Sequence, residues 1–161
     1  MQQYIGNKII NAVKMTREDY NALRGWQVPS DENPADDGFL VEYLDGGKAN
    51  VSGYSGYVSW SPADVFMRAY RPTSSMLFGD ALVMLMAGHR VCRAGWNGKG
   101  MWLALVSASH YEVAAGMLDN NSENPCSPKL LPWIGMKTAD GGFVPWLCSQ
   151  TDMLAEDWQV V

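Results

Sequence analysis

A single amphipathic stripe in the second half of the chain sets the strongest limit on its fold. Five apolar residues recur there at the spacing of one helix face: Phe78, Ala81, Leu82, Leu85 and Met86. Gly88 stands where such a helix should end. Because the stripe must bury its apolar side and the segments after it have the pattern of strands, we expect one main helix packed on a small antiparallel sheet.

Two turn signals divide the segment after this helix into short strands. Asn97-Gly98 and Asp140-Gly141 are dipeptides that favour tight hairpin turns between antiparallel strands. Strand-like segments occur at residues 89–94, 101–107, 134–138, 143–146 and 158–161. Residues 111–118 have a helical pattern within a long polar connection, and a short helix is expected from Thr151 through Glu156. The second half is therefore predicted to be an α+β unit.

The start of the chain predicts a second, separate group of elements. Thr16 and Asp19 form a capping-box pattern, so we expect a helix over residues 17–24 that ends at Gly25. Two of its residues should form the buried side, Tyr20 and Leu23. Residues 26–38 contain prolines and an acidic run, and they predict an exposed loop.

The remaining elements of the first half complete an additional N-terminal α+β subdomain. Strands are expected at residues 39–44 and 54–60, and a helix should follow with Ser61 as its N-cap and an end near Tyr70. The run Arg-Pro-Thr-Ser-Ser at residues 71–75 is typical of a domain boundary. We therefore divide the chain into an extension, residues 1–72, and a second domain, residues 76–161.

Composition excludes several classes of function. A formal net charge of −5 disfavours an extended nucleic acid as partner, because such surfaces depend on Lys and Arg. A small nucleotide enclosed in a pocket remains compatible with this charge. Three cysteines without a CxxC pair and two distant histidines predict neither a disulfide framework nor a metal site. The chain contains no apolar run of about 18 residues and does not begin like a signal peptide, so we expect no membrane association and a cytoplasmic protein.

No catalytic motif is recognisable, and we predict neither catalytic residues nor a cofactor. Cys148 could act as a nucleophile with His89 or His110 as its base, but an inert buried thiol is the favoured interpretation. Asp152 fits either the start of a short helix or a binding site, and Trp133 and Trp146 fit either core or ligand contacts.

Two long runs carry a resemblance to a known family. They are FGDALVMLMAGHRVCRAGWNGKGMWLALV at residues 78–106 and LPWIGMKTADGGFVPWLCSQTDMLAEDWQVV at residues 131–161. The R-x-G-W-N-G-K-G-M hairpin and the P-W-I-G-M-K-T-A-D-G to S-Q-T-D-x-L-A-x-D-W ending closely resemble the phage-encoded Thoeris anti-defence two family. The N-terminal half resembles a segment that recurs in small phage proteins, and it implies no chemistry.

The resemblance implies a sponge rather than an enzyme. Members of that family sequester cyclic ADP-ribose isomers made by bacterial TIR-domain immune proteins, without degrading them. They assemble as homotetramers with ligand pockets at subunit interfaces, and some also bind cyclic dinucleotides at separate pockets. The corresponding location is the cytoplasm of the host bacterium. A nucleotide-cleaving enzyme and a protein-binding structural phage module are the alternative hypotheses.

The resemblance also assigns roles to individual residues. Trp96 becomes a stacking platform for adenine, and Asp152 becomes an acceptor for ribose hydroxyls or the base edge. Neutral contacts would come from Asn97, Gln150 and Thr151, and the walls of the site from Trp133 and Trp146. The candidates for meeting the diphosphate are three basic residues, Arg93, Lys99 and Lys137.

Overall fold

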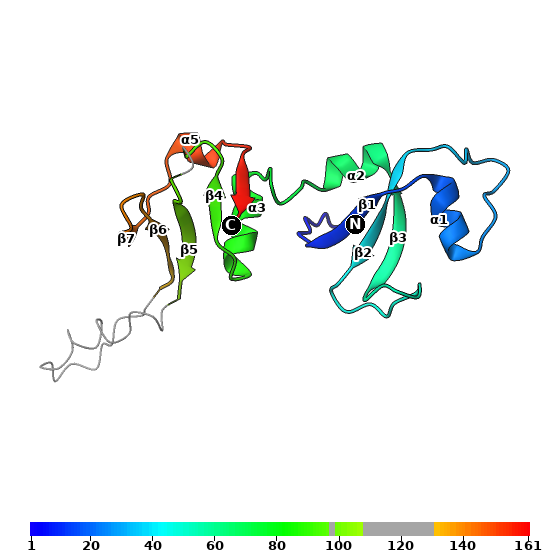
Figure 1. The fold of residues 1–161 in the computed structure, drawn as a ribbon, viewed down its shortest axis with the longest axis horizontal. Helices are drawn as coiled ribbons and strands as arrows, with labels where there is room; N and C mark the ends of the chain where they lie inside the picture. Colours follow the sequence, from blue (N-terminus) through cyan, green and yellow to red (C-terminus); the bar gives the residue numbers. More distant parts are fainter. Residues whose placement is uncertain (97–98, 108–130) are drawn as a thin grey trace, which may run out of the picture. The chain divides into compact units, whose positions relative to one another are not determined.

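The computed structural model describes residues 1–96, 99–107 and 131–161, which form two compact units, Met1–Arg71 and Pro72–Val161 (Figure 1). Both units combine helices with an antiparallel sheet, so the predicted α+β class is confirmed. The Asn97-Gly98 turn and the helix predicted at residues 111–118 lie outside the described residues. No described helix has the length and apolar character that a membrane crossing requires.

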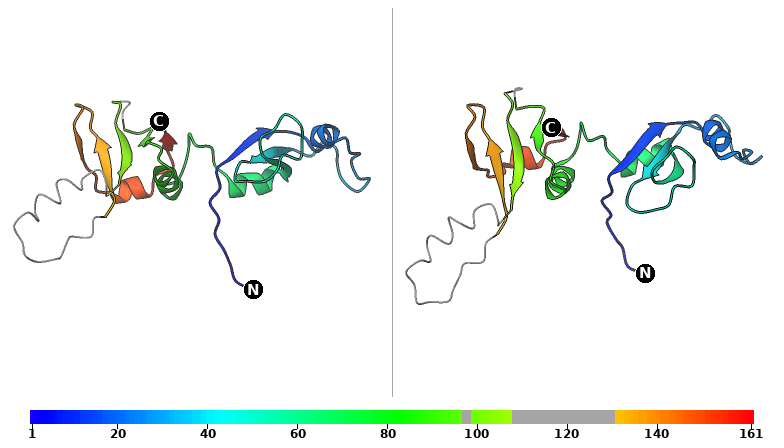
Figure 2. Two further views of the ribbon diagram at one scale, coloured as in Figure 1. Left: turned by 90° about the horizontal axis from the view of Figure 1, so that it is seen from below. Right: turned by 60° about the horizontal axis from the view of Figure 1, so that its bottom comes forward.

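The first unit has a three-stranded sheet in the order β1-β2-β3. Its elements are β1 (Ile10–Lys14), α1 (Arg17–Arg24), β2 (Gly38–Tyr43), β3 (Tyr57–Pro62) and α2 (Ala63–Ala69). Tyr20 of α1 packs on Leu40 and Val58. Phe39 points to the opposite face from Leu40, and its ring stacks on Phe66 of α2. Residues 1–9 extend away from this sheet (Figure 2).

Capping determines where α1 begins and ends. The Thr16 side chain accepts a hydrogen bond from the Asp19 amide, and Gly25 ends the helix in the left-handed conformation at φ 66°. These predicted bounds are confirmed. The predicted burial of Leu23 is wrong, because Tyr20 and its neighbour Asn21 supply the buried side and Leu23 is 39% exposed.

The predicted capping of α2 is also wrong. Ser61 lies in β3, paired with Phe39, and α2 begins two residues later, at Ala63. Pro62 occupies the N-cap position and makes no side-chain hydrogen bond there.

At the outer edge of β3, a side chain occupies the backbone groups of one residue, Val58. The amide of Asn50 donates to the Val58 carbonyl at 2.8 Å and accepts from the Val58 amide at 2.7 Å. These are the two contacts that a neighbouring strand would make with Val58. The Asn50 side chain therefore takes the place of a fourth strand at this position.

The second unit has a five-stranded sheet in the order β7-β6-β5-β4-β8 (Figures 1 and 2). Its strands are β4 (Val91–Arg93), β5 (Trp102–Val106), β6 (Trp133–Lys137), β7 (Phe143–Pro145) and β8 (Trp158–Val160). The helices are α3 (Phe78–Met86) and α5 (Gln150–Met153). The short helix expected through Glu156 ends earlier, at Met153.

The main helix α3 packs on one face of this sheet, as predicted. The core between them contains Leu85, Val91, Leu103 and the fully buried Trp158. The expected burial of Met86 is wrong, since it is 70% exposed and Met84 is buried instead. The buried side is centred on Ala81, and at about 100° per residue Met84 lies about 60° from it around the helix, whereas Met86 lies about 140° away.

We predict that Leu103→Ala destabilises the second unit by about 2–5 kcal/mol, because it removes a fully buried side chain between α3 and the sheet. The matched control is Met86→Ala, which should change the free energy of unfolding by no more than about 0.5 kcal/mol because Met86 is 70% exposed on the same helix. Urea denaturation followed by tryptophan fluorescence measures both. Equal losses for the two variants would contradict this assignment of the core.

Candidate functional site

A cluster of aromatic rings lies at one end of the second unit. Trp158 is surrounded by Phe78 at 5.4 Å, Trp96 at 5.4 Å and Trp146 at 6.1 Å between ring centroids. The rings of Trp96 and Trp146 both meet Trp158 edge to face. The indole N–H of Trp158 donates to the Asp152 carbonyl at 3.0 Å, which fixes α5 over the cluster.

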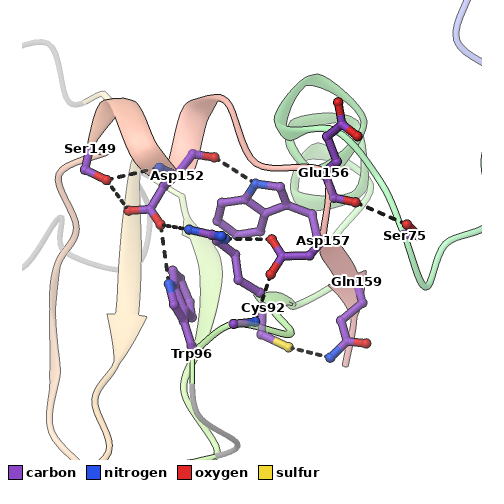
Figure 3. Close-up of polar contacts among 11 residues, drawn as sticks. Ser75, Cys92, Trp96, Ser149, Asp152, Glu156, Asp157 and Gln159 are labelled. Carbon is purple, nitrogen blue, oxygen red and sulfur yellow. Dashed lines mark hydrogen bonds and ion pairs between the residues drawn. The ribbon is translucent and has the colours of Figure 1, made fainter.

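The start of α5 orients the carboxylate of Asp152. Ser149 is the N-cap, and its hydroxyl accepts from the Asp152 amide at 3.1 Å. The same hydroxyl donates to Asp152 Oδ2 at 2.7 Å. The Asp152 side chain is thus held by its own helix cap, and its other oxygen contacts Arg93 at the end of β4 and Trp96 in the β4–β5 connection (Figure 3).

Arg93 at the end of β4 lies between two carboxylates. Its Nη1 donates to Asp152 Oδ1 at 2.8 Å, and its Nε donates to Asp157 Oδ1 at 2.7 Å. Asp157 Oδ2 accepts from the Gly95 amide at 2.8 Å. The indole N–H of Trp96 also reaches Asp152 Oδ1, at 3.4 Å (Figure 3). We call Arg93, Asp152 and Asp157 the arginine network.

Both carboxylates of the arginine network are held ionised. The hydrogen bond from Arg93 lowers the pKa of Asp157, and the Gly95 amide adds to this effect. Partial burial raises the pKa of Asp152, but hydrogen bonds from Ser149, Arg93 and Trp96 outweigh it, so the pKa lies below its ordinary value. The hydrogen bonds that Arg93 donates to Asp157 and Asp152 raise the pKa of Arg93.

This arrangement favours a ligand that donates hydrogen bonds. One guanidinium faces two carboxylates, so the arginine network has an excess of one negative charge. An ionised Asp152 accepts from hydroxyl or amino groups and repels phosphate. Beside it, no described ring stacks in parallel on Trp96, which is half-buried.

Four further candidates lie near this cluster or on α5. Gln150 and Thr151 are exposed on α5 itself, and Trp146 packs at 6.4 Å from Trp96. Arg93 contacts the two carboxylates, so its guanidinium is already occupied by charges of its own chain.

The other candidates are placed elsewhere or not described. Ile134 and Met136 pack on the core beneath α3, so Trp133 and Lys137 point to the opposite face of β6, where the Trp133 ring lies 6.0 Å from Phe143. Lys137 Nζ donates to the Gly100 carbonyl at 3.1 Å. Lys99 is exposed, and Asn97 lies outside the described residues.

The sequence did not identify Asp157 as part of the site. Its partner Arg93 lies 64 residues earlier, so no local pattern connects the two. The role of Ser149 could have been found, because a serine three residues before an acidic residue is a capping pattern. Trp158 was expected only as part of a closing strand, and its full burial at the centre of the cluster depends on tertiary packing.

Cys148 does not have the properties of an activated nucleophile. Burial raises the pKa of its thiol, and the nearby Asp152 adds to this effect, so the thiolate is disfavoured. His110, one of its possible bases, lies outside the described residues. Within the described ranges, no group of three or more His, Cys, Asp or Glu side chains could hold a metal ion.

Comparisons with known proteins match the part of the chain that contains this cluster. Residues 76–161 match the model of a family described as the Thoeris anti-defense 2-like domain. A relative named Thoeris anti-defense 2, from Bacillus phage SP01, is 42% identical over 92 residues, which cover 55% of this chain and 97% of the relative. The resemblance predicted from the sequence is confirmed.

We predict that the second unit loses stability as pH falls through the carboxylate range. Asp152 and Asp157 have lowered pKa values in the folded state, so their stabilising contribution is complete above the unfolded value of about 4 and is lost as pH falls through the folded values. Carboxyl 13C NMR titration should place both midpoints below about 3.9. Ser149→Ala should raise the midpoint of Asp152, and an unchanged midpoint would contradict the role given to the cap.

Proposed function

Because the chain belongs to the Thoeris anti-defense 2-like family, we propose that it is a phage anti-defence protein that sequesters signalling nucleotides. The ligands are cyclic ADP-ribose-type molecules, such as glyco-cyclic ADP-ribose, made by bacterial TIR immune proteins. The protein binds them without cleaving them, in the cytoplasm of the host bacterium.

The observation that carries this proposal is the pairing of Trp96 with Asp152. The two side chains come from different parts of the second unit, yet a 3.4 Å hydrogen bond joins the indole N–H to the carboxylate. An aromatic plane beside an ionised acceptor offers stacking to a purine and hydrogen bonds to ribose hydroxyls or an exocyclic amine. These are the groups that a cyclic ADP-ribose isomer presents.

In this proposal, residues outside the arginine network contact the diphosphate of the ligand. Arg93 faces two carboxylates, and the excess negative charge there opposes a phosphate. Lys99 is exposed, and the Lys137 ammonium keeps a third donor beyond its bonds to the Gly100 and Thr138 carbonyls. We therefore favour Lys99 over Arg93 as a contact for the diphosphate, because Lys137 points to the face of β6 opposite the core on which Trp96 packs.

The geometry gives less support to a nucleotide-cleaving enzyme. A general acid or base works best with a pKa near the operating pH, whereas the pKa values of Asp152 and Asp157 are shifted away from neutrality. The raised pKa of Cys148 also opposes nucleophilic attack. Binding without conversion is the function that these groups favour.

Self-association is part of the proposal. Large apolar side chains next to α5 are exposed, with Leu147 at 91% and Leu154 at 81%. Exposed apolar groups beside a polar site are typical of surfaces that contact another protein. We expect a homo-oligomer, a tetramer in the family's pattern, with ligand pockets near subunit contacts. Cyclic dinucleotides are a second ligand class to be tested at separate pockets.

We predict that Trp96→Ala weakens binding of glyco-cyclic ADP-ribose by about 5- to 150-fold, the loss expected when about 1–3 kcal/mol of stacking is removed. Asp152→Ala should also weaken binding, because it removes the acceptor for ligand hydroxyls. The matched control is Trp26→Ala, which removes an exposed tryptophan of the first unit. Isothermal titration measures all three, and an equal effect of the two tryptophan variants would contradict the assigned site.

We further predict that the bound ligand is returned intact. The protein is incubated with glyco-cyclic ADP-ribose, freed of unbound ligand and heat-denatured, and the released molecule is identified by mass spectrometry. A product of altered mass would support the nucleotide-cleaving alternative. Absence of any bound nucleotide, together with capture of a protein partner, would support the structural or protein-binding alternative.

A shortened chain beginning at Pro72 should retain ligand binding. The family match begins at residue 76, and the preceding residues support β8, because the Thr73 carbonyl accepts from the Val160 amide at 3.0 Å. Titration of the shortened and full chains with the same nucleotide makes the comparison. A large loss of affinity with retained circular dichroism would assign the first unit a part in the pocket.

A further inference from the structure

Asp157 lies outside the set of residues predicted to bind the ligand, yet it contacts the segment that carries Trp96. Its Oδ2 accepts from the Gly95 amide at 2.8 Å, and its backbone carbonyl accepts from the Ala94 amide at 3.0 Å. A Cβ on Gly95 would stand only 3.0 Å from Asp157 Oδ2, so a glycine lets the carboxylate approach closely. The backbone before Trp96 is therefore held against Asp157.

Asp157 also fixes the guanidinium that reaches Asp152. The guanidinium of Arg93 is planar, so the hydrogen bond from Nε to Asp157 Oδ1 sets the direction in which Nη1 points. That direction leads to Asp152 Oδ1 at 2.8 Å. The Arg93 side chain is 16% exposed and that of Asp152 is 14% exposed, so solvent screens their attraction less than it screens a surface pair.

Two chains of contacts thus run from Asp157 to the predicted ligand residues. One passes through the Gly95 amide to the backbone of Trp96. The other passes through Arg93 to Asp152, which accepts from the Trp96 indole N–H. Both end at the same pair of side chains.

We propose that Asp157 is a positioning residue of the nucleotide site, which sets, through Gly95 and Arg93, the orientation in which Trp96 and Asp152 meet the ligand. Asp157 itself does not contact the nucleotide. The identity of the ligand in this inference rests on the proposed function, but the orientation exists in the unliganded protein and is measurable without any nucleotide.

The first test uses the full chain without ligand. The indole N–H resonance of Trp96, assigned with Trp96→Phe, and the Gly95 amide resonance are compared in the wild type and in Asp157→Asn by 15N NMR. Asparagine keeps an acceptor for Gly95 but loses the charge that holds Arg93. We expect the Trp96 indole resonance to shift, although Asp157 does not touch that ring. The control is Glu156→Gln, which removes an exposed neighbouring carboxylate and should leave both resonances in place.

The second test measures affinity for glyco-cyclic ADP-ribose by isothermal titration. Asp157→Asn should weaken binding about tenfold, the size of effect found when a side chain that orients a binding group is lost. In a protein that already carries Asp152→Asn, adding Asp157→Asn should reduce the affinity less than about twofold. The ion pair through which Arg93 connects Asp157 to Asp152 is already lost there. If Asp157 had only a structural role, the affinity losses of Asp157→Asn and Asp152→Asn would add in the double variant.

Each result decides the inference. An unshifted Trp96 indole in folded Asp157→Asn, or additive losses of affinity, overturns it. If the wild type does not bind the nucleotide, the proposed function fails, and the indole resonance still decides whether Asp157 orients Trp96. If Asp157→Asn does not fold, Arg93→Lys replaces it: a single ammonium cannot span both carboxylates, so the indole must shift there or the inference fails.

Discussion

The arrangement of α5 and the aromatic cluster in the second unit depends on the ion pairs of Arg93 with Asp152 and Asp157. Arg93 pairs with Trp158 across β4 and β8, so it lies at the strand pairing that adds the edge strand β8 to the sheet. From there it connects the sheet to α5, which is too short to be stable by itself. Loss of one partner in a partly buried ion pair leaves a charge without compensation, and this makes the three side chains interdependent.

Trp96 and Asp152, the two main residues of the proposed site, are held in position in the absence of a ligand. The aromatic cluster packs Trp96 against Trp158, and the cap of α5 holds Asp152 in place before any ligand arrives. Binding then requires little ordering of side chains, which leaves more of the contact energy available as affinity. The lowered pKa of Asp152 extends the pH range over which it stays ionised toward the acid side.

Local patterns in the sequence predicted the elements better than the contacts between them. The cap of α1, the position of helix α3 and the turn at Asp140-Gly141 depend on residues a few positions apart, and all three lie where expected. Leu23 and Met86 were misassigned because burial depends on which side of a helix the sheet covers. Arg93 was expected to meet a diphosphate, but its carboxylate partners lie 59 and 64 residues later, and only the fold brings them together.

The Asn50 side chain affects whether a strand of another chain can add to the sheet of the first unit. Because its amide occupies both backbone groups of Val58, the β3 edge of this sheet does not offer a continuous row of donors and acceptors to another chain. A strand that added to β3 would first have to displace the Asn50 amide from Val58, so edge-to-edge association is disfavoured at this position.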